Sequence, residues 1–150
     1  MSRRRVVVTG LGIISPVGNS IAAAWENILA GKSGIGPITN FDVSDFPVRI
    51  AGEIRDFDVS EYIPGKDARR MGAFIHYGIA AASQAIADAG LEITASNATR
   101  AGVAIGSGIG GLHGIENAYQ AYVDGGPRKI SPFFVPGNII NMIGGNLSIM

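Results

Sequence analysis

The sequence GGPRKISPFFVP occupies residues 125–136 and joins a constrained backbone to two kinds of surface chemistry. Its three prolines and two adjacent glycines restrict the backbone to defined turns. Arg128 and Lys129 supply two adjacent positive charges, whereas Phe133, Phe134 and Val135 form a block that would be an apolar patch if left in water. The stretch therefore predicts a shaped surface with an apolar part that the core or an interface must cover.

Two other segments join an apolar run to a glycine turn. Residues 5–12 read RVVVTGLG, and residues 101–111 read AGVAIGSGIGG. Continuous apolar runs rich in β-branched residues and followed by glycine are typical of strands buried on both faces. We therefore expect buried strands at residues 5–9 and 101–106.

Helical signals lie between and after these two segments. Ser20 is a good N-cap and Gly31 a good stop for a helix with Trp25 on its apolar face. Apolar residues recur every three to four positions over residues 67–89, which predicts one long buried helix ending at Gly90. Four further elements are expected: a long irregular connection at 32–47, a short strand at 50–57, a helical turn at 59–63 and a helix from 112 to about 123.

The order strand, helix, helix, strand, helix predicts an α/β fold in which helices cover the sheets. The apolar run at residues 139–150 has no polar terminator, although domain ends usually lie in exposed polar segments. We therefore expect residues 1–150 to be the N-terminal portion of a longer protein.

The amino-acid composition argues against several classes of binding partner, namely nucleic acid, membranes and metal ions. The net charge is zero, so no global field favours nucleic acid, and no apolar run approaches the length of a membrane span. The chain has no cysteine and only two histidines, far apart in sequence, which gives no metal-ligand spacing. A cytoplasmic protein without a metal or cofactor is expected.

Neither glycine-rich turn fits a nucleotide-binding motif. After Gly10 and Gly12, Ser15 stands where a dinucleotide fingerprint has its third glycine, and Pro16 follows at once. The run at residues 106–111 lacks the Lys-Ser/Thr ending of a phosphate-binding loop. Tight turns and close backbone packing explain both segments better.

No residue qualifies as a catalytic nucleophile. Thr9, Ser107 and Ser131 have no histidine placed by a motif to act as their base. His76 is expected to be a partly buried or surface residue of the long helix, and His113 to face solvent. We therefore assign no catalytic residue to this chain.

The chain resembles the β-ketoacyl-[acyl-carrier-protein] synthases, the condensing enzymes of fatty acid synthesis, over essentially all 150 residues. The resemblance is carried by residues 5–12, 66–71, 106–111, 125–136 and 138–142. It implies a thiolase-like layered αβαβα fold, of which this chain would be most of the N-terminal half, in an obligate homodimer. It also implies an acyltransferase that condenses acyl and malonyl groups carried on phosphopantetheine. The family's nucleophilic cysteine and catalytic histidines lie beyond the matched segment, so the chain alone is expected to be inactive.

The resemblance gives the basic residues a role. Lys66, Arg69 and Arg70 fall within about one helical turn and can share a face. Without the resemblance they are a solvated helix start, where cations oppose the helix dipole. By resemblance these residues, with Arg128 and Lys129, form the positive patch that docks acyl carrier protein.

The resemblance also implies roles for two apolar residues. From sequence alone, Ile109 is a core isoleucine; in the family the matching residue borders the acyl-chain pocket. The residue matching Phe134 reaches the other subunit's acyl pocket, so we expect a dimer interface there first and plain core second. Two rival functions remain: a chain-length factor that has lost activity, and a complete carrier-binding or dimerisation module.

Overall fold

The computed structural model describes residues 4–150 and divides into two compact units. The first unit contains the described residues up to Phe57 together with Ser83–Leu91. The second contains Asp58–Ala82 and Glu92–Met150. Helix α3, Ala73–Asp88, contributes residues to both units.

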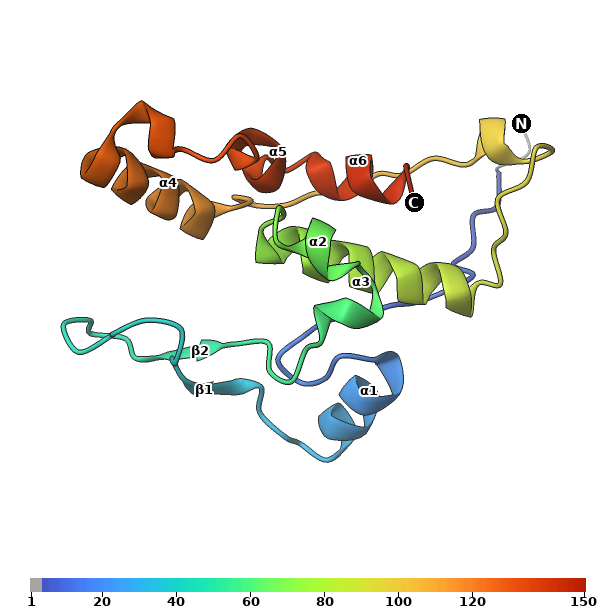
Figure 1. The fold of residues 1–150 in the computed structure, drawn as a ribbon. Coiled ribbons are helices and arrows are strands. Elements are labelled where there is room, and N and C mark those ends of the chain that lie inside the picture. The colour runs from blue at the N-terminus through green and yellow to red at the C-terminus, as the bar shows by residue number, and fades with distance from the viewer. Residues whose placement is uncertain (1–3) are drawn as a thin grey trace. The chain divides into compact units, whose positions relative to one another are not determined.

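Besides its part of α3, the described portion of the first unit holds one helix and one small sheet. Helix α1 runs over Ile21–Leu29, and strands β1, Ile35–Pro37, and β2, Ile50–Gly52, pair antiparallel with Ile35 opposite Gly52 (Figure 1). Ser20 caps α1 by accepting a hydrogen bond from the amide of Ala23 at 3.3 Å. The predicted cap and helix are therefore confirmed.

A buried carboxylate fastens the connection between β1 and β2. Glu53 directly follows β2, is only 9% exposed and accepts hydrogen bonds from the Thr39 amide at 2.9 Å, the Thr39 hydroxyl at 2.8 Å and the Asn40 amide at 3.1 Å. These bonds, first those from Thr39, hold the pKa of Glu53 below its ordinary value. The residues expected to form an irregular connection at 32–47 thus include a strand and an anchored turn.

The second unit is helical. Besides its part of α3 it contains the helices α2, Gly65–Ala68; α4, Leu112–Gly125; α5, Phe134–Asn138; and α6, Met142–Leu147. Short 3₁₀ turns are η1, Val59–Glu61; η2, Ala98–Arg100; and η3, Pro127–Lys129. Figure 1 shows α5 beside α4, and the two helices are in contact. Buried apolar residues from η1 to α6 form its core: Ile63, Ala68, Ile75, Ile79 and Ile143.

The prediction of one long helix over residues 67–89 is wrong in one respect, because two helices are separated by residues 69–72, with a turn at Arg69 and Arg70. The amide of Gly72 donates to the carbonyl of Gly137 at 2.9 Å, instead of continuing a helix from α2. The break thus depends on a distant segment. Gly90, with a φ of +58°, does follow the end of α3 as predicted.

The prediction of buried strands at residues 5–9 and 101–106 is also wrong. Neither segment forms a strand, and Val6 and Val8 are 91% and 80% exposed. A strand needs a neighbour for its backbone hydrogen bonds. Among residues 4–150 the sheet consists of β1 and β2 alone, so these apolar runs have no partner strand. The strand expected at 50–57 is likewise only β2.

The other predicted elements are confirmed: the turn near residue 59 is η1, and the helix from residue 112 is α4, which ends two residues later than predicted. Within residues 4–150, every helix is too short or too polar to span a bilayer.

Candidate functional site

A cavity of about 550 Å³ lies in the second unit. Three parts of the chain line it: the segment between α2 and α3, the glycine turn with the following half of α4, and the residues from η3 through α5. These segments are up to about seventy positions apart in sequence, and the cavity is the place where they meet. It lies wholly within one unit.

Three of the five cations predicted to form a docking patch line this cavity. They are Arg69, Arg70 and Lys129, and all three are exposed. Within residues 4–150 none of them forms an ion pair, since the described ion pair is between His113 and Glu116. Three cations without acidic partners are available to bind an anion.

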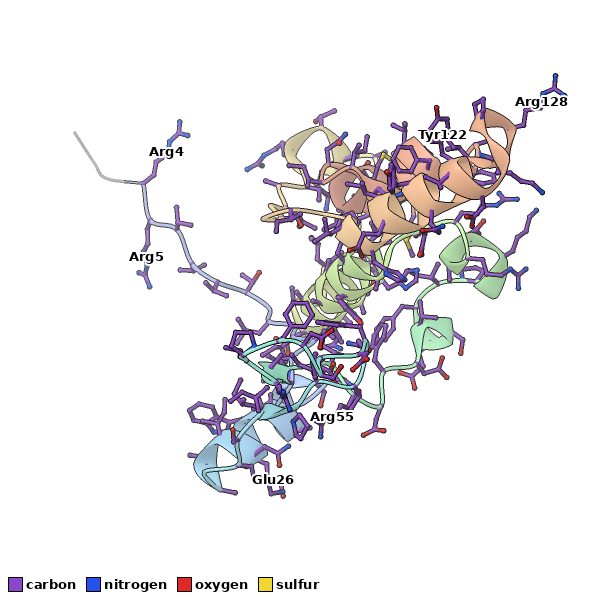
Figure 2. The ribbon with its side chains drawn as sticks, turned by 90° about the vertical axis from the view of Figure 1, so that its left-hand side faces the viewer. Arg4, Arg5, Glu26, Arg55, Tyr122 and Arg128 are labelled. Carbon is purple, nitrogen blue, oxygen red and sulfur yellow. The ribbon has the colours of Figure 1, made fainter. Side chains whose placement is uncertain are left out.

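The remaining two predicted cations lie outside the cavity lining. Lys66 is exposed within α2. Arg128 lies in η3 and points away from the ribbon in Figure 2. The structure thus brings Arg69, Arg70 and Lys129 together and leaves Lys66 and Arg128 on the adjoining surface.

The conflict with a helix dipole that was expected for Lys66, Arg69 and Arg70 is not found for the two arginines. Because α2 ends at Ala68, Arg69 is its C-cap and Arg70 follows it. Positive charge is favourable at a helix C-terminus, although four residues make only a weak dipole. The two arginines therefore do not oppose the dipole of α2, whereas Lys66 is the second residue of that helix.

The aromatic part of the stretch at 125–136 supplies the apolar wall. Phe134 begins α5, is half-buried and lines the cavity. Phe133 also lines it, and the guanidinium of Arg70 lies 4.5 Å from the centre of its ring, a cation–π contact. Val135 is 56% exposed. Charge and apolar surface thus meet along one wall.

Ile109, the other residue expected to contact an acyl chain, does not line this cavity. Its side chain is 70% exposed, so the alternative of a core isoleucine is wrong for the chain as described. It directly precedes Gly110, which does line the cavity. The structure therefore places Ile109 next to the cavity lining in sequence without joining it to Phe134.

Local backbone signals explain how the wall is formed. Gly126 has a φ of +76°, which glycine adopts without strain, and Pro127 opens the 3₁₀ turn that follows. The Ser131 hydroxyl then accepts from the amide of Phe133 at 3.1 Å, and the Ser131 carbonyl from the amide of Phe134 at 3.0 Å. The turn predicted from the glycine and proline residues is thus followed directly by α5.

Asn138 is a site residue that the sequence analysis did not single out. Its side-chain amide donates to the carbonyl of Phe134 at 2.6 Å, and its own carbonyl accepts from the amide of Gly111 at 3.1 Å. A Cβ at Gly111 or Gly114 would overlap the Asn138 side-chain oxygen. Two glycines three positions apart share a helix face, so their spacing was a signal that another segment approaches closely.

The polar residues provide no nucleophile and base pair. Within residues 4–150, no hydrogen bond joins Thr9, Ser107 or Ser131 to either histidine. His76 is half-buried with Nε2 2.9 Å from the carbonyl of Ala68, and the His113 side chain is 87% exposed, as predicted.

No metal centre is formed either, since the described residues contain no cluster of three or more His, Cys, Asp or Glu. The whole chain lacks cysteine. The cavity lining thus combines positively charged and apolar side chains.

The family is shown by a match that covers almost the whole chain. The family model of the β-ketoacyl synthase N-terminal domain matches residues 3–150. The chain therefore belongs to the β-ketoacyl synthases.

Among curated relatives, the chain is similar to the N-terminal portion of 3-oxoacyl-[acyl-carrier-protein] synthase 2. It is 60% identical to that protein of Vibrio harveyi over 150 residues, which is 100% of this chain and 36% of the relative. It is 54% identical to the protein of the same name from Coxiella burnetii, over 99% of this chain and 36% of the relative. The chain thus spans about a third of the length of the curated relatives it matches.

Solved structures confirm the fold family. A ketosynthase/chain length factor of ishigamide matches with a TM-score of 0.80 at 29% identity, over 99% of this chain and 37% of that one. A ketosynthase of a type II PKS, solved in complex with its acyl-carrier protein and bound to the hexaketide, matches with a TM-score of 0.78 at 27% identity, over 98% and 38%. The described residues thus have a ketosynthase-like fold of the thiolase type, although helices predominate and little sheet is present.

Proposed function

We propose that the whole protein is a cytosolic, homodimeric 3-oxoacyl-carrier synthase, in which this chain is most of the N-terminal thiolase-like half. An enzyme cysteine would first attack the thioester of an acyl carrier, so that the acyl group moves to the cysteine and the carrier leaves as a thiol. Malonyl carrier would then lose CO2, and the resulting carbanion would attack the acyl-cysteine thioester. The products are a 3-oxoacyl carrier two carbons longer, CO2 and the free cysteine thiol after protonation.

The observation that carries this proposal is the cavity shared by cations and an aromatic wall. Arg69, Arg70 and Lys129 line it together with Phe134. A carrier protein with an acidic face and a phosphopantetheine-linked acyl chain presents negative charge next to an apolar group. Complementary charge speeds the encounter and orients the partner.

Lys66 lies three residues before Arg69, Arg128 directly precedes Lys129, and both are exposed, so they add to the positive surface. We assign all five cations to carrier docking and Ile109 with Phe134 to the acyl chain. The similarity to a ketosynthase solved with its acyl-carrier protein supports a carrier as the partner.

The nucleophile would come from outside this chain. The chain has no cysteine and spans about a third of its curated relatives. The 150 residues alone are therefore proposed to be inactive, and condensation would need the thiol and the proton-transferring groups of the remaining sequence.

The test is a condensation assay of the intact protein with acyl carrier and malonyl carrier. Mass spectrometry of the carrier is expected to show a 3-oxoacyl product two carbons longer, and none when residues 1–150 are assayed alone. Absence of product from the intact protein would refute the enzyme proposal, and product from the 150 residues would refute the proposal that they are inactive alone.

One alternative has support from a comparison: the ishigamide structure is described as a ketosynthase/chain length factor. A chain-length factor would bind beside an active partner and shape its pocket without forming product itself. The same assay separates the two functions, because an inactive intact protein that alters the product length of an added ketosynthase would favour the alternative.

A further inference from the structure

Helix α5 is held against two other segments of the second unit at its C-terminal end. The carbonyl of Gly137 accepts from the amide of Gly72, and the carbonyl of Asn138 accepts from the amide of Gly111 at 3.1 Å. Gly137 is buried, and a Cβ there would lie 2.6 Å from the carbonyl oxygen of Arg70. The end of α5 is thus fixed to the segment before α3 and to the start of α4.

The Asn138 side chain connects these attachments to the cavity wall. Its Nδ2 donates to the carbonyl of Phe134, four residues earlier, at 2.6 Å. Its Oδ1 lies against Gly111 and Gly114, where a Cβ would overlap it. One side chain therefore spans the distance between the Phe134 backbone and the first turn of α4.

The cavity lies between the same groups. Phe134, Gly111, Gly114 and Asn138 all line it. Protein interiors transmit small displacements through close packing, so a change in the size of residue 138 is expected to move Phe134 relative to α4.

We infer that Asn138 is a positioning residue that determines the length of acyl chain accepted beside Phe134. This inference rests on the proposed function, in which Phe134 contacts the acyl group. A pocket distinguishes chains that differ by one methylene by about ten- to two-hundredfold, so a small shift of Phe134 is enough to alter selectivity.

The experiment compares Asn138→Ala, Gly114→Ala and the double variant in the intact protein. The readout is the ratio of kcat/KM for a long and a short acyl carrier, together with the KM for malonyl carrier. Each single variant is expected to change the ratio by about tenfold and to leave the KM for malonyl carrier unchanged.

The double variant is the decisive control. The three atoms that a Cβ at Gly114 would approach most closely all belong to the Asn138 side chain. Asn138→Ala therefore makes room for Gly114→Ala, and the double variant is expected to lie closer to wild type than the sum of the single effects.

A further variant, Asn138→Ser, tests whether a change in chain-length selectivity results from a loss of folding. Asn138→Ser keeps a donor that can reach the carbonyl four residues earlier but removes the bulk beside Gly114. It is expected to change the chain-length ratio while keeping the wild-type melting temperature.

Equal loss of kcat/KM for all chain lengths, or strictly additive effects of the two single changes, would overturn the positioning role. An intact wild-type protein that forms no product would instead refute the proposed function, so the two failures are distinguishable.

Discussion

The guanidinium of Arg70 lies 4.5 Å from the centre of the Phe133 ring, so a cation from the end of α2 covers an aromatic residue that directly precedes α5. Exposed contacts of this kind contribute about 0.5–1 kcal/mol. A double-mutant cycle of Arg70→Gln and Phe133→Leu, measured by denaturant unfolding, should give a coupling of that size.

Arg69→Gln is the matched control for this cycle, because Arg69 lines the same cavity and has no described contact with a ring. Its cycle with Phe133→Leu should give no coupling beyond error. Equal coupling free energies for both arginines would mean that the Phe133 ring is stabilised by nearby positive charge in general and not by contact with Arg70.

Glu53 makes the stability of the first unit depend on pH. Its pKa is lowered by hydrogen bonds from Thr39 and Asn40, so the unfolded state takes up the proton first as pH falls. The stabilisation is complete above the ordinary glutamate pKa of about 4.3 and is lost as pH falls from there through the folded pKa. The protection factors of the Thr39 and Asn40 amides, which are corrected for the intrinsic pH dependence of exchange, should therefore fall as the pH is lowered below about 4.3.

Glu53→Gln should abolish most of this pH dependence, because the amide keeps an acceptor without a titrating proton. Wild type and variant are compared over the same pH series. The same fall in protection factors in both proteins would assign the effect to another carboxylate.

Loss of the Ser20 cap should destabilise α1. The Ser20 hydroxyl accepts from the amide of Ala23, and replacing such a cap by alanine costs about 1 kcal/mol. Ser20→Ala should lower the unfolding free energy by that amount, whereas Ser20→Asp, which retains an acceptor, should restore it. Equal destabilisation by both substitutions would show that the hydroxyl does not act as a cap.

Substitution of Ile79 should strongly reduce the free energy of unfolding. It is fully buried in α3 and packs in the cluster with Ile75 and Ile143. Ile79→Ala should cost about 2–5 kcal/mol and Ile79→Val about 0.5–1.5 kcal/mol, as measured by denaturant unfolding. A loss from Ile79→Ala no larger than that from Ile79→Val would contradict this packing.

The fold could be predicted from the sequence where its signals are local. Ser20, Gly31 and Gly90 are helix caps and stops that act within a few residues, and α1 and the end of α3 lie as expected. The break at Gly72 could not be predicted, because it depends on a hydrogen bond to Gly137. The apolar run at 5–9 indicated a strand, but a strand also requires a partner.

The candidate site shows the same division. The cations and Phe134 were found from the sequence with the help of a family resemblance, and the cavity brings Arg69, Arg70, Lys129 and Phe134 together. Asn138 was missed because its importance depends on contacts with Gly111 and Gly114, more than twenty positions away. A close approach between helices is visible in sequence only as small residues at helical spacing.

The central claim is that the cations at the cavity receive an acidic carrier protein. The most direct measurement is the KM of the intact protein for acyl carrier after Arg69→Glu, with Arg100→Glu as the control, since Arg100 lies in η2 and does not line the cavity. Arg69→Glu should raise this KM by at least about tenfold, equivalent to about 1.4 kcal/mol, while kcat at saturating carrier and the Arg100→Glu variant stay close to wild type. A KM that is unchanged by Arg69→Glu, or raised equally by Arg100→Glu, would contradict the claim.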